Sequence, residues 1–296
     1  MAEILGKILP VFIALAIGYF TGKKKLISSE GIATFKNLVV NICLTAVLIG
    51  AFAETDFSLP NLKQPLVILI ACILALIIGK ALCLLFKVKG TTAPYLTSGF
   101  EAGMLGYSLF TVLYGSELLP AFAILDLGQM TFVFTIYRIL ISGSKSPKSV
   151  IDNIVKTPVI WGMVLGIVLS ATGLYEKGKE VIKPVTDFIS APTSMIILLT
   201  IGWDMASGKI NPKRAIMPVV ARIIALGILF GIIIYLNSAL SLGIHEGALL
   251  LMFSLPGPYV LPIFAKADEE KADIASALSI QTVLALAIFA VMVILK

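Results

Sequence analysis

Two acidic residues stand inside long apolar segments, where an ionisable side chain is costly and indicates a function. Glu101 lies within the apolar segment 93–113, and Asp126 lies within the segment 119–141. A buried carboxylate can bind a cation together with carbonyl oxygens, or take up a proton where burial disfavours its charge. These acids therefore predict an ion-binding site. The alternative for Glu101 is structural, as a partner of Arg222 or as the cap of a helix end.

Amide and guanidinium groups accompany these acids. Gln129 follows Asp126 by one helical turn, so both lie on one face, which either lines a cavity or bonds to neighbouring helices. Gln281 supplies an amide at the corresponding place near the end of the chain. Arg222 is a candidate partner for an anionic substrate, with snorkelling or pairing with Asp204 as the alternatives.

Glycine and proline interrupt two of the apolar segments. The runs are SGFEAGMLGYS (98–108) and SLPGPYVLP (254–262). Such breaks expose backbone groups that lipid cannot satisfy, so they occur where they line a cavity or pack inside protein. Exposed amides suit carboxylates, exposed carbonyls suit a cation, and paired breaks point to a transporter's binding site. The alternative is a set of simple kinks. The candidate residues are Gly103, Gly106, Pro256, Gly257 and Pro258.

The composition predicts an all-α membrane protein with many spans. Of 296 residues, 58% are hydrophobic and only 14% charged, with a mean hydropathy of +1.02, which is too apolar for a soluble domain. Windows of about 20 residues predict ten membrane-spanning helices joined by short loops. They are 4–22, 33–53, 65–86, 93–113, 119–141, 155–174, 185–206, 215–240, 246–266 and 273–295.

Most lysine and arginine residues follow the odd-numbered spans, which predicts a multi-pass protein of the cell membrane with both termini outside the cytoplasm. The net charge of +6 is explained by these loops, so we expect the lipid bilayer and no nucleic acid as a partner. The sequence has one histidine and lacks a zinc motif and a Gly-x-Ser-x-Gly elbow. We therefore expect that the protein is not an enzyme and that it has no cofactor.

The two halves predict an inverted repeat of five spans each, over 1–141 and 155–296. Pro10 and Gly18 have the same separation as Pro158 and Gly166, and similar runs follow Gln129 and Gln281. The two interrupted spans, the fourth and the ninth, are counterparts in this arrangement. The polar stretch 142–156 joins the halves.

The chain resembles the auxin efflux carrier family, including its bacterial members. The stretch SLPGPYVLPIFAKADEEKADIASALSIQTVLALAIF is similar to that family's ninth and tenth helices, and GFEAGMLGYSLFTVLYG to its fourth-helix motif. Two positions depart from the family pattern, because Glu101 stands where Asn is usual and Ser108 where Pro is usual. These departures concern the substrate and the coupling ion more than the fold.

The resemblance implies an architecture shared with sodium–bile acid symporters and sodium–proton antiporters. Scaffold helices would lie within 1–53 and 155–206, and transport helices within 65–141 and 215–295, with broken helices crossing at the membrane midplane. A homodimer through the scaffold is implied as well. Asn41 would face the transport part from the scaffold side.

These features predict a secondary active transporter that moves a small organic anion by elevator-type alternating access. Coupling to H⁺ or Na⁺ is expected, with a Na⁺ site near Glu101 and Gln281 as one option and no firm metal site. The alternative is a cation–proton antiporter that uses Glu101 and Asp126 as its exchanging acids. The substrate stays open among hydroxy-dicarboxylates, aromatic acids and sterol-like acids.

Overall fold

A computed structural model describes the chain except residues 1, 89, 143–154, 208–211 and 262–267. The described residues form helices and connecting loops and contain no strand. The α-helices are α1 (Ala2–Lys23), α2 (Ser29–Leu38), α3 (Leu44–Ala53), α4 (Lys63–Leu85), α5 (Tyr107–Tyr114), α6 (Leu119–Phe132), α7 (Arg138–Ser142), α9 (Pro158–Ala171), α10 (Leu174–Ser190), α11 (Thr193–Ser207), α12 (Pro212–Leu240), α13 (Glu246–Ser254) and α14 (Asp268–Leu295). Short turns of 3₁₀ or π-helix are η1 (Val39–Cys43), η2 (Ala93–Thr97), η3 (Ala102–Gly106), η4 (Ser116–Leu118) and η5 (Val133–Tyr137).

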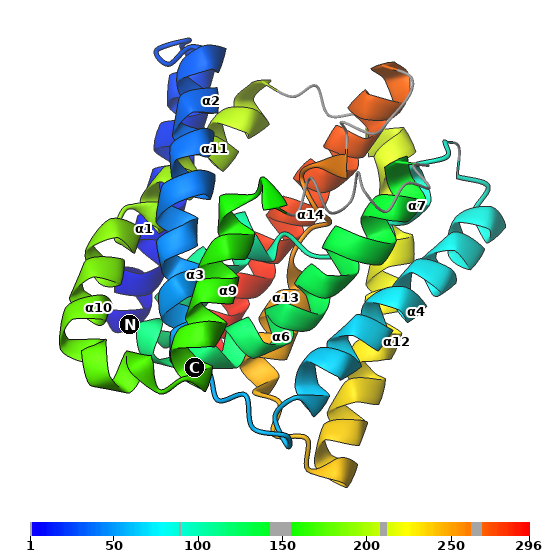
Figure 1. Ribbon diagram of the computed structural model, residues 1–296. Helices are drawn as coiled ribbons and strands as arrows, with labels where there is room; N and C mark the ends of the chain where they lie inside the picture. Colours follow the sequence, from blue (N-terminus) through cyan, green and yellow to red (C-terminus); the bar gives the residue numbers. More distant parts are fainter. Residues whose placement is uncertain (1, 89, 143–154, 208–211, 262–267) are drawn as a thin grey trace.

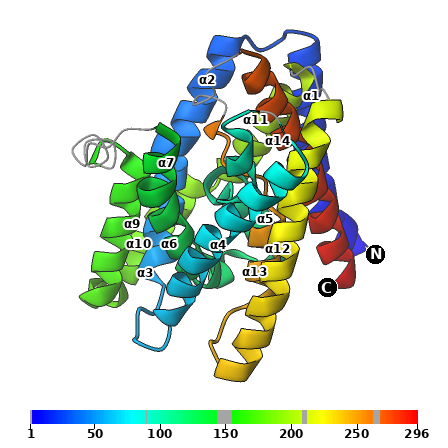
Figure 2. The same cartoon turned by 90° about the vertical axis from the view of Figure 1, so that its right-hand side faces the viewer.

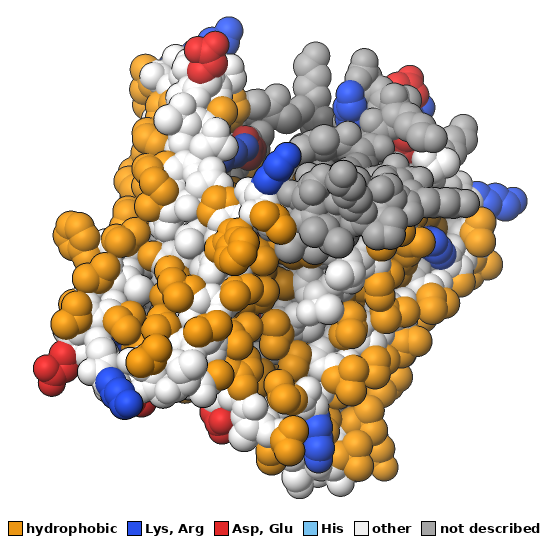
Figure 3. All heavy atoms as spheres, in the orientation of Figure 1, with side chains coloured by type: hydrophobic (Ala, Val, Ile, Leu, Met, Phe, Trp, Pro, Cys, Tyr) orange, Lys and Arg blue, Asp and Glu red, His pale blue; other side chains and the backbone are white. Residues whose placement is uncertain are grey.

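Six helical stretches among the described residues are long and apolar enough to cross a membrane. They are Ser29–Ala53, Lys63–Leu85, Ser116–Ile141, Leu174–Ala206, Pro212–Leu240 and Glu269–Leu295. Two shorter apolar helices cover Ile8–Lys23 and Pro158–Ala171. Hydrophobic side chains cover the middle of the face in Figure 3, and charged ones gather toward its ends. The protein is therefore membrane-embedded, as its composition predicts.

The two spans that the sequence predicts to be interrupted are interrupted in the structure. Helix η2 ends at Thr97, and the helix over η3 and α5 begins only at Ala102. Helix α13 ends at Ser254, and the following residues leave the helical conformation. The last part of this ninth predicted span, including Pro262, lies outside the described residues. The number ten and the inverted repeat stay predictions.

The polar stretch 175–184 is predicted from the sequence to be a loop between the sixth and seventh spans, and the structure differs from this prediction. It is helical, because α10 runs over Leu174–Ser190 and continues into α11 after a break at Ala191 and Pro192. Helix α10 has charged and apolar faces, and Pro184 inside it does not end the helix. Ion pairs with helix spacing, such as Lys183 with Asp187, support a helix here.

The helices gather in two groups that lie side by side (Figures 1 and 2). In the first group α1 packs along α11, and α3 packs along α9 and α10. In the second group α4 packs against α6 and α12, and α14 packs against α12 and α13. The groups meet where α3 contacts α6 and where α1 contacts α14. Both termini lie near each other in the lower half of the view in Figure 1.

Small residues allow α1 and α11 to touch at their backbones. A Cβ atom added to Gly18 would collide with the carbonyl group of Leu199, and one added to Gly202 with the carbonyl group of Leu15. Close backbone approach through glycine is the usual packing device between membrane helices. This contact holds the first group together.

Gly18→Leu should destabilise the protein by about 1–3 kcal/mol, because the new side chain overpacks the contact between α1 and α11. Gly227→Leu is the matched control, since a Cβ there meets no atom within 4 Å. Thermal unfolding in detergent measures both variants. Equal melting temperatures for the two variants would contradict this packing.

Candidate functional site

The two interrupted segments touch through their backbones. The amide of Glu101 donates to the carbonyl oxygen of Pro256 over 2.9 Å, which joins the first break to the second. Gly99 makes the first turn possible, because its φ of +71° lies in the left-handed region that favours glycine. A Cβ atom at Gly99 would also come within 3.1 Å of Pro258. The contact therefore depends on the glycine and proline that mark the breaks in the sequence.

The side chain of Glu101 binds both breaks. Its Oε2 accepts a hydrogen bond from the amide of Tyr259 over 2.7 Å, and its Oε1 accepts one from the amide of Met104 over 3.4 Å. Glu101 thus caps the start of η3 and also fixes the second break. No ion pair with Arg222 occurs in the described part of the chain. Of the two structural alternatives for Glu101, a pair with Arg222 and a helix cap, the structure shows the helix cap.

Arg222 satisfies the carbonyl ends of both interrupted helices. Its guanidinium group donates to the carbonyl oxygens of Leu96 and Gly99, over 2.8 and 2.9 Å, and of Leu255, over 2.8 Å. The side chain is 3% exposed, and its guanidinium lies over the ring of Phe100. Arg222 therefore neither snorkels nor pairs with Asp204. The carbonyls that could have bound a cation are used by this residue.

The two glutamines occupy matching places, one beside each break. Gln129 donates from its Nε2 to the carbonyl oxygen of Phe100 over 2.7 Å. Gln281 accepts a hydrogen bond from the amide of Gly257 over 2.9 Å. Both side chains are buried, so each one replaces a backbone partner that the break removes. The repeat that would relate the two glutamines stays a prediction.

A cavity of about 830 Å³ opens between the two groups of helices, beside the two breaks. The predicted site residues that line it are Glu101, Gly103, Asp126, Gln129 and Pro258. The predicted residues that are not among its lining residues are Asn41, Gly106, Arg222, Pro256, Gly257 and Gln281. Most residues of this second set lie behind the cavity wall and stabilise the two breaks. Gly106, for example, faces Phe122 and Leu255.

Asn41 is placed differently from the prediction. The π-turn η1 puts its neighbours Val40 and Leu44 at the cavity, while Asn41 is exposed and is absent from the lining residues. A π-turn shifts the helical register by one residue relative to an α-helix. That shift cannot be read from an apolar sequence.

Several cavity residues were not singled out from the sequence. Lys36 on α2 pairs with Asp204 on α11, with Nζ 2.6 Å from Oδ2, and Arg138 on α7 also lines the cavity. Tyr259 lines it too, and its hydroxyl lies 2.8 Å from that of Thr282. The Lys36–Asp204 pair joins residues 168 positions apart, so only the fold reveals it.

The start of η3 presents a free backbone donor to the cavity. The amides of Ala102 and Gly103 have no hydrogen-bond acceptor among the described residues, and Gly103 lines the cavity. Free amides at the first turn of a helix attract anions. A cluster of three or more His, Cys, Asp or Glu side chains suited to a metal ion is absent from the described residues.

The sequence matches a membrane transport family over nearly its whole length. Residues 3–294 match the model of the family described as membrane transport protein. The uncharacterized transporter YfdV of Escherichia coli K12 is 24% identical over 278 residues, covering 84% of this chain and 85% of that protein. The uncharacterized transporter MJ1031 of Methanocaldococcus jannaschii is 25% identical over 210 residues, covering 67% of this chain and 68% of that protein.

Arg222→Lys should lower the melting temperature markedly, because a lysine keeps the charge but lacks the planar fork that reaches three carbonyls. Each buried carbonyl left without a donor costs about 1–3 kcal/mol. Arg214→Lys is the control, because Arg214 pairs at the exposed surface with Glu269 and Asp273. Thermal unfolding of both variants in detergent is the measurement. An Arg222→Lys variant as stable as wild type would show that the carbonyls do not need the guanidinium.

Proposed function

The chain belongs to the membrane transport protein family, which is the family of the auxin efflux carriers, and from this premise we propose that it is a secondary transporter of small organic anions. The observation that carries the proposal is the cavity at the contact between the two breaks. It is concave, mostly apolar in its lining, and has a few polar groups that converge on one place, as small-molecule sites have.

The charge arrangement favours a carboxylate ligand. Arg222 binds the carbonyl oxygens of Leu96 and Leu255, which are the negative ends of both interrupted helices. At the positive end of η3 the Glu101 carboxylate accepts from the amide of Met104, whereas the Gly103 amide has no acceptor among the described residues and is available to a carboxylate. Arg138 adds a basic group to the wall, where Lys36 is paired with Asp204. A carboxylate placed against Gly103 would keep its apolar part among the aliphatic and aromatic side chains of the cavity.

The acidic side chains of the cavity couple transport of the anion to a proton or a cation. Glu101 and Asp126 both line it, and Asp126 is 2% exposed. An anion that enters beside two such groups is held better when a cation or proton offsets their charge. H⁺ and Na⁺ are the two candidate coupling ions. In the case of Na⁺, the ion would bind near Glu101, and Gln281 would support the second break from the side away from the cavity. One thermal-shift screen can test the coupling ion and the substrate class together.

An elevator-type movement is the mechanism that we propose. The helices form two groups, and the cavity lies between them, so sliding one group past the other would carry the bound anion. The first group corresponds to the scaffold expected from the resemblance and the second to the transport part. Ten spans in a five-plus-five repeat, a homodimer through the scaffold and extracytoplasmic termini complete this proposal.

A cation–proton antiporter is the second candidate. Asp126 Oδ1 and Gln129 Oε1 are buried, lie on one face of α6, and have no hydrogen-bond partner among the described residues. Unpartnered buried oxygens of this kind are suited to a bound cation. In this reading the acids exchange Na⁺ for H⁺ and no organic anion binds.

A thermal-shift screen separates the two candidates. A ligand that binds only the folded state stabilises it by RT ln(1 + [L]/Kd), which is about 2.7 kcal/mol at 100 Kd. The panel holds malate, phenylacetate and cholate, each with and without Na⁺ and at two pH values. We expect at least one acid to raise the melting temperature, and to do so more strongly with Na⁺ or at lower pH. Stabilisation by Na⁺ alone, with no response to an acid, would favour the antiporter.

Glu101→Gln should abolish ion-driven accumulation of the substrate in proteoliposomes and leave a folded protein. The amide oxygen of glutamine can still accept the short bond from Tyr259, but the group can no longer carry a charge or take up a proton. Glu246→Gln, an exposed acid at the start of α13, is the control. Ion-driven accumulation at the wild-type level in Glu101→Gln would exclude Glu101 as the coupling acid.

A further inference from the structure

A second cavity of about 350 Å³ lies between α3, α10 and α11 on one side and α5 on the other. Its wall is rich in hydroxyl groups, in contrast to the mostly apolar first cavity. The serine and threonine residues that line it are Ser108, Thr111, Ser116, Thr186, Ser190, Thr193 and Ser194. Hydroxyls both donate and accept hydrogen bonds, so this wall can hold water and pass protons.

The two cavities lie end to end along the same helices. On the helix Ser29–Ala53 the first cavity is lined from Lys36 to Leu48, and the second from Ala46 onward to Glu54 at its end. On the helix over η3 and α5, Gly103 and Met104 line the first cavity, whereas Tyr107, Ser108 and Thr111 line the second. The second cavity therefore approaches the site from the opposite side of the bundle.

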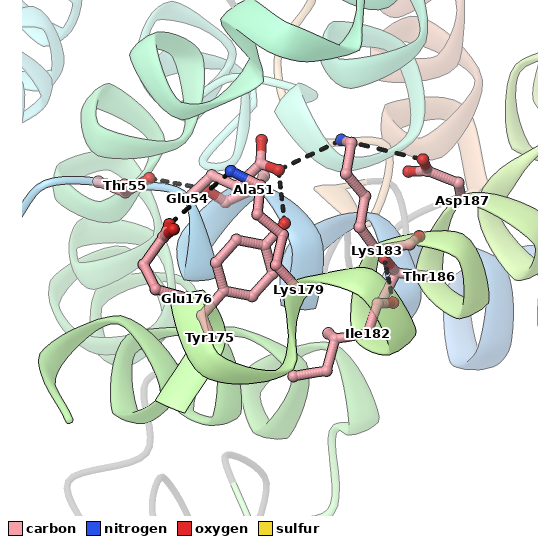
Figure 4. Close-up of polar contacts among 10 residues, drawn as sticks. All are labelled: Ala51, Glu54, Thr55, Tyr175, Glu176, Lys179, Ile182, Lys183, Thr186 and Asp187. Carbon is pink, nitrogen blue, oxygen red and sulfur yellow. Dashed lines mark hydrogen bonds and ion pairs between the residues drawn. The ribbon is translucent and has the colours of Figure 1, made fainter. Parts of the chain in front are cut away.

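The second cavity has more acidic than basic groups. Lys183 lies between Glu54 and Asp187, 3.2 Å from Glu54 Oε1 and 3.8 Å from Asp187 Oδ2 (Figure 4). The hydroxyl of Tyr175 donates to Glu54 over 2.5 Å. One lysine faces two carboxylates, so the charges of this group sum to −1 when all are ionised. Such a cavity concentrates cations and protons.

Tyr107 lies in the wall of the second cavity and interacts with a residue of the first. It lines the second cavity and is 1% exposed, and its ring packs edge-on against Phe122 at 5.0 Å between centroids. Its hydroxyl interacts electrostatically with Asp126, which lines the first cavity. Tyr107 Oη and Asp126 Oδ1 are both fully buried, and neither has another hydrogen-bond partner among the described residues. The pair therefore forms a polar contact between a residue of the second cavity and a residue of the first.

The other titratable groups near Asp126 are few. Glu101 of the first break and Cys72 of α4 interact with it electrostatically. Helix α3 contributes no titratable side chain, and those of α13 and η4 are the exposed Glu246 and Glu117. The tyrosine of η5, Tyr137, donates its hydroxyl hydrogen to the carbonyl oxygen of Tyr95. Of these groups, Tyr107 is the one that also lines the second cavity.

We propose that the second cavity delivers the coupling proton and that the Tyr107 hydroxyl passes it to Asp126. The O–H bond of Tyr107 breaks as an O–H bond forms on Asp126 Oδ1, and Tyr107 takes a replacement proton from water in the second cavity. Tyrosine is neutral before and after the step. The inference rests on the proposed function and identifies H⁺ as its coupling ion.

Tyr107→Phe tests the relay, because it removes one oxygen atom and keeps the ring packed on Phe122. Proteoliposomes with a trapped pH dye receive labelled malate or phenylacetate, and uptake of the acid and of protons is recorded together. We expect the ratio of protons to acid to fall at least tenfold. Exchange of internal for external labelled acid, which needs no net proton movement, should stay within twofold of wild type. Tyr114→Phe is the control, because Tyr114 lies on the same helix but lines neither cavity. It should keep the wild-type ratio of protons to acid and the wild-type rate of exchange.

Each other outcome has a definite meaning. A wild-type proton ratio in Tyr107→Phe overturns the relay, and so does transport driven by Na⁺ without protons, while both leave the proposed function in place. Failure of the wild type to exchange either acid contradicts the proposed function itself and the relay with it. If Tyr107→Phe does not fold, Asp126→Asn removes the proton acceptor instead. It should show the same loss of proton uptake, and an unchanged ratio there overturns the relay as well.

Discussion

The architecture depends on how the carbonyl groups of two broken helices are satisfied in an apolar interior. An unpartnered carbonyl at that depth costs several kcal/mol, and lipid offers no donor. Arg222 supplies three donors to Leu96, Gly99 and Leu255, so one side chain stabilises both breaks at their point of contact. Gln129 donates to a further carbonyl oxygen, that of Phe100, while Glu101 and Gln281 accept from the amides of Tyr259 and Gly257.

This solution determines the electrostatics of the cavity. The guanidinium group offsets the carbonyl ends, and Glu101 caps the amide end of η3 at Met104. The Gly103 amide is left without an acceptor among the described residues, and Gly103 lines the cavity. The acids Glu101 and Asp126 lie close by and can offset a proton or a cation. An anion site and a cation or proton site therefore arise at one place. The proposed coupled transport of an acid rests on that proximity.

The sequence predicts those parts of the site that depend on local chemistry. Glycine and proline locate the breaks, and the buried acids and amides locate the cavity wall, because each is costly in a membrane helix without a local reason. Contacts between distant segments could not be predicted. Arg222 stands near a helix end, which favours snorkelling, yet its partners lie 126, 123 and 33 residues away. The register shift at η1 and the position of Tyr107 in the wall of the second cavity also require the folded arrangement.

The most direct test of the central claim is an experimental structure of the protein with a bound acid, chosen from the panel by its thermal shift. The account predicts density in the first cavity, with the carboxylate against the Gly103 amide and near Glu101, and with Arg222 still bound to its three carbonyls. Density for the acid in the second cavity, or an acid bound directly to the Arg222 guanidinium group, would contradict the account.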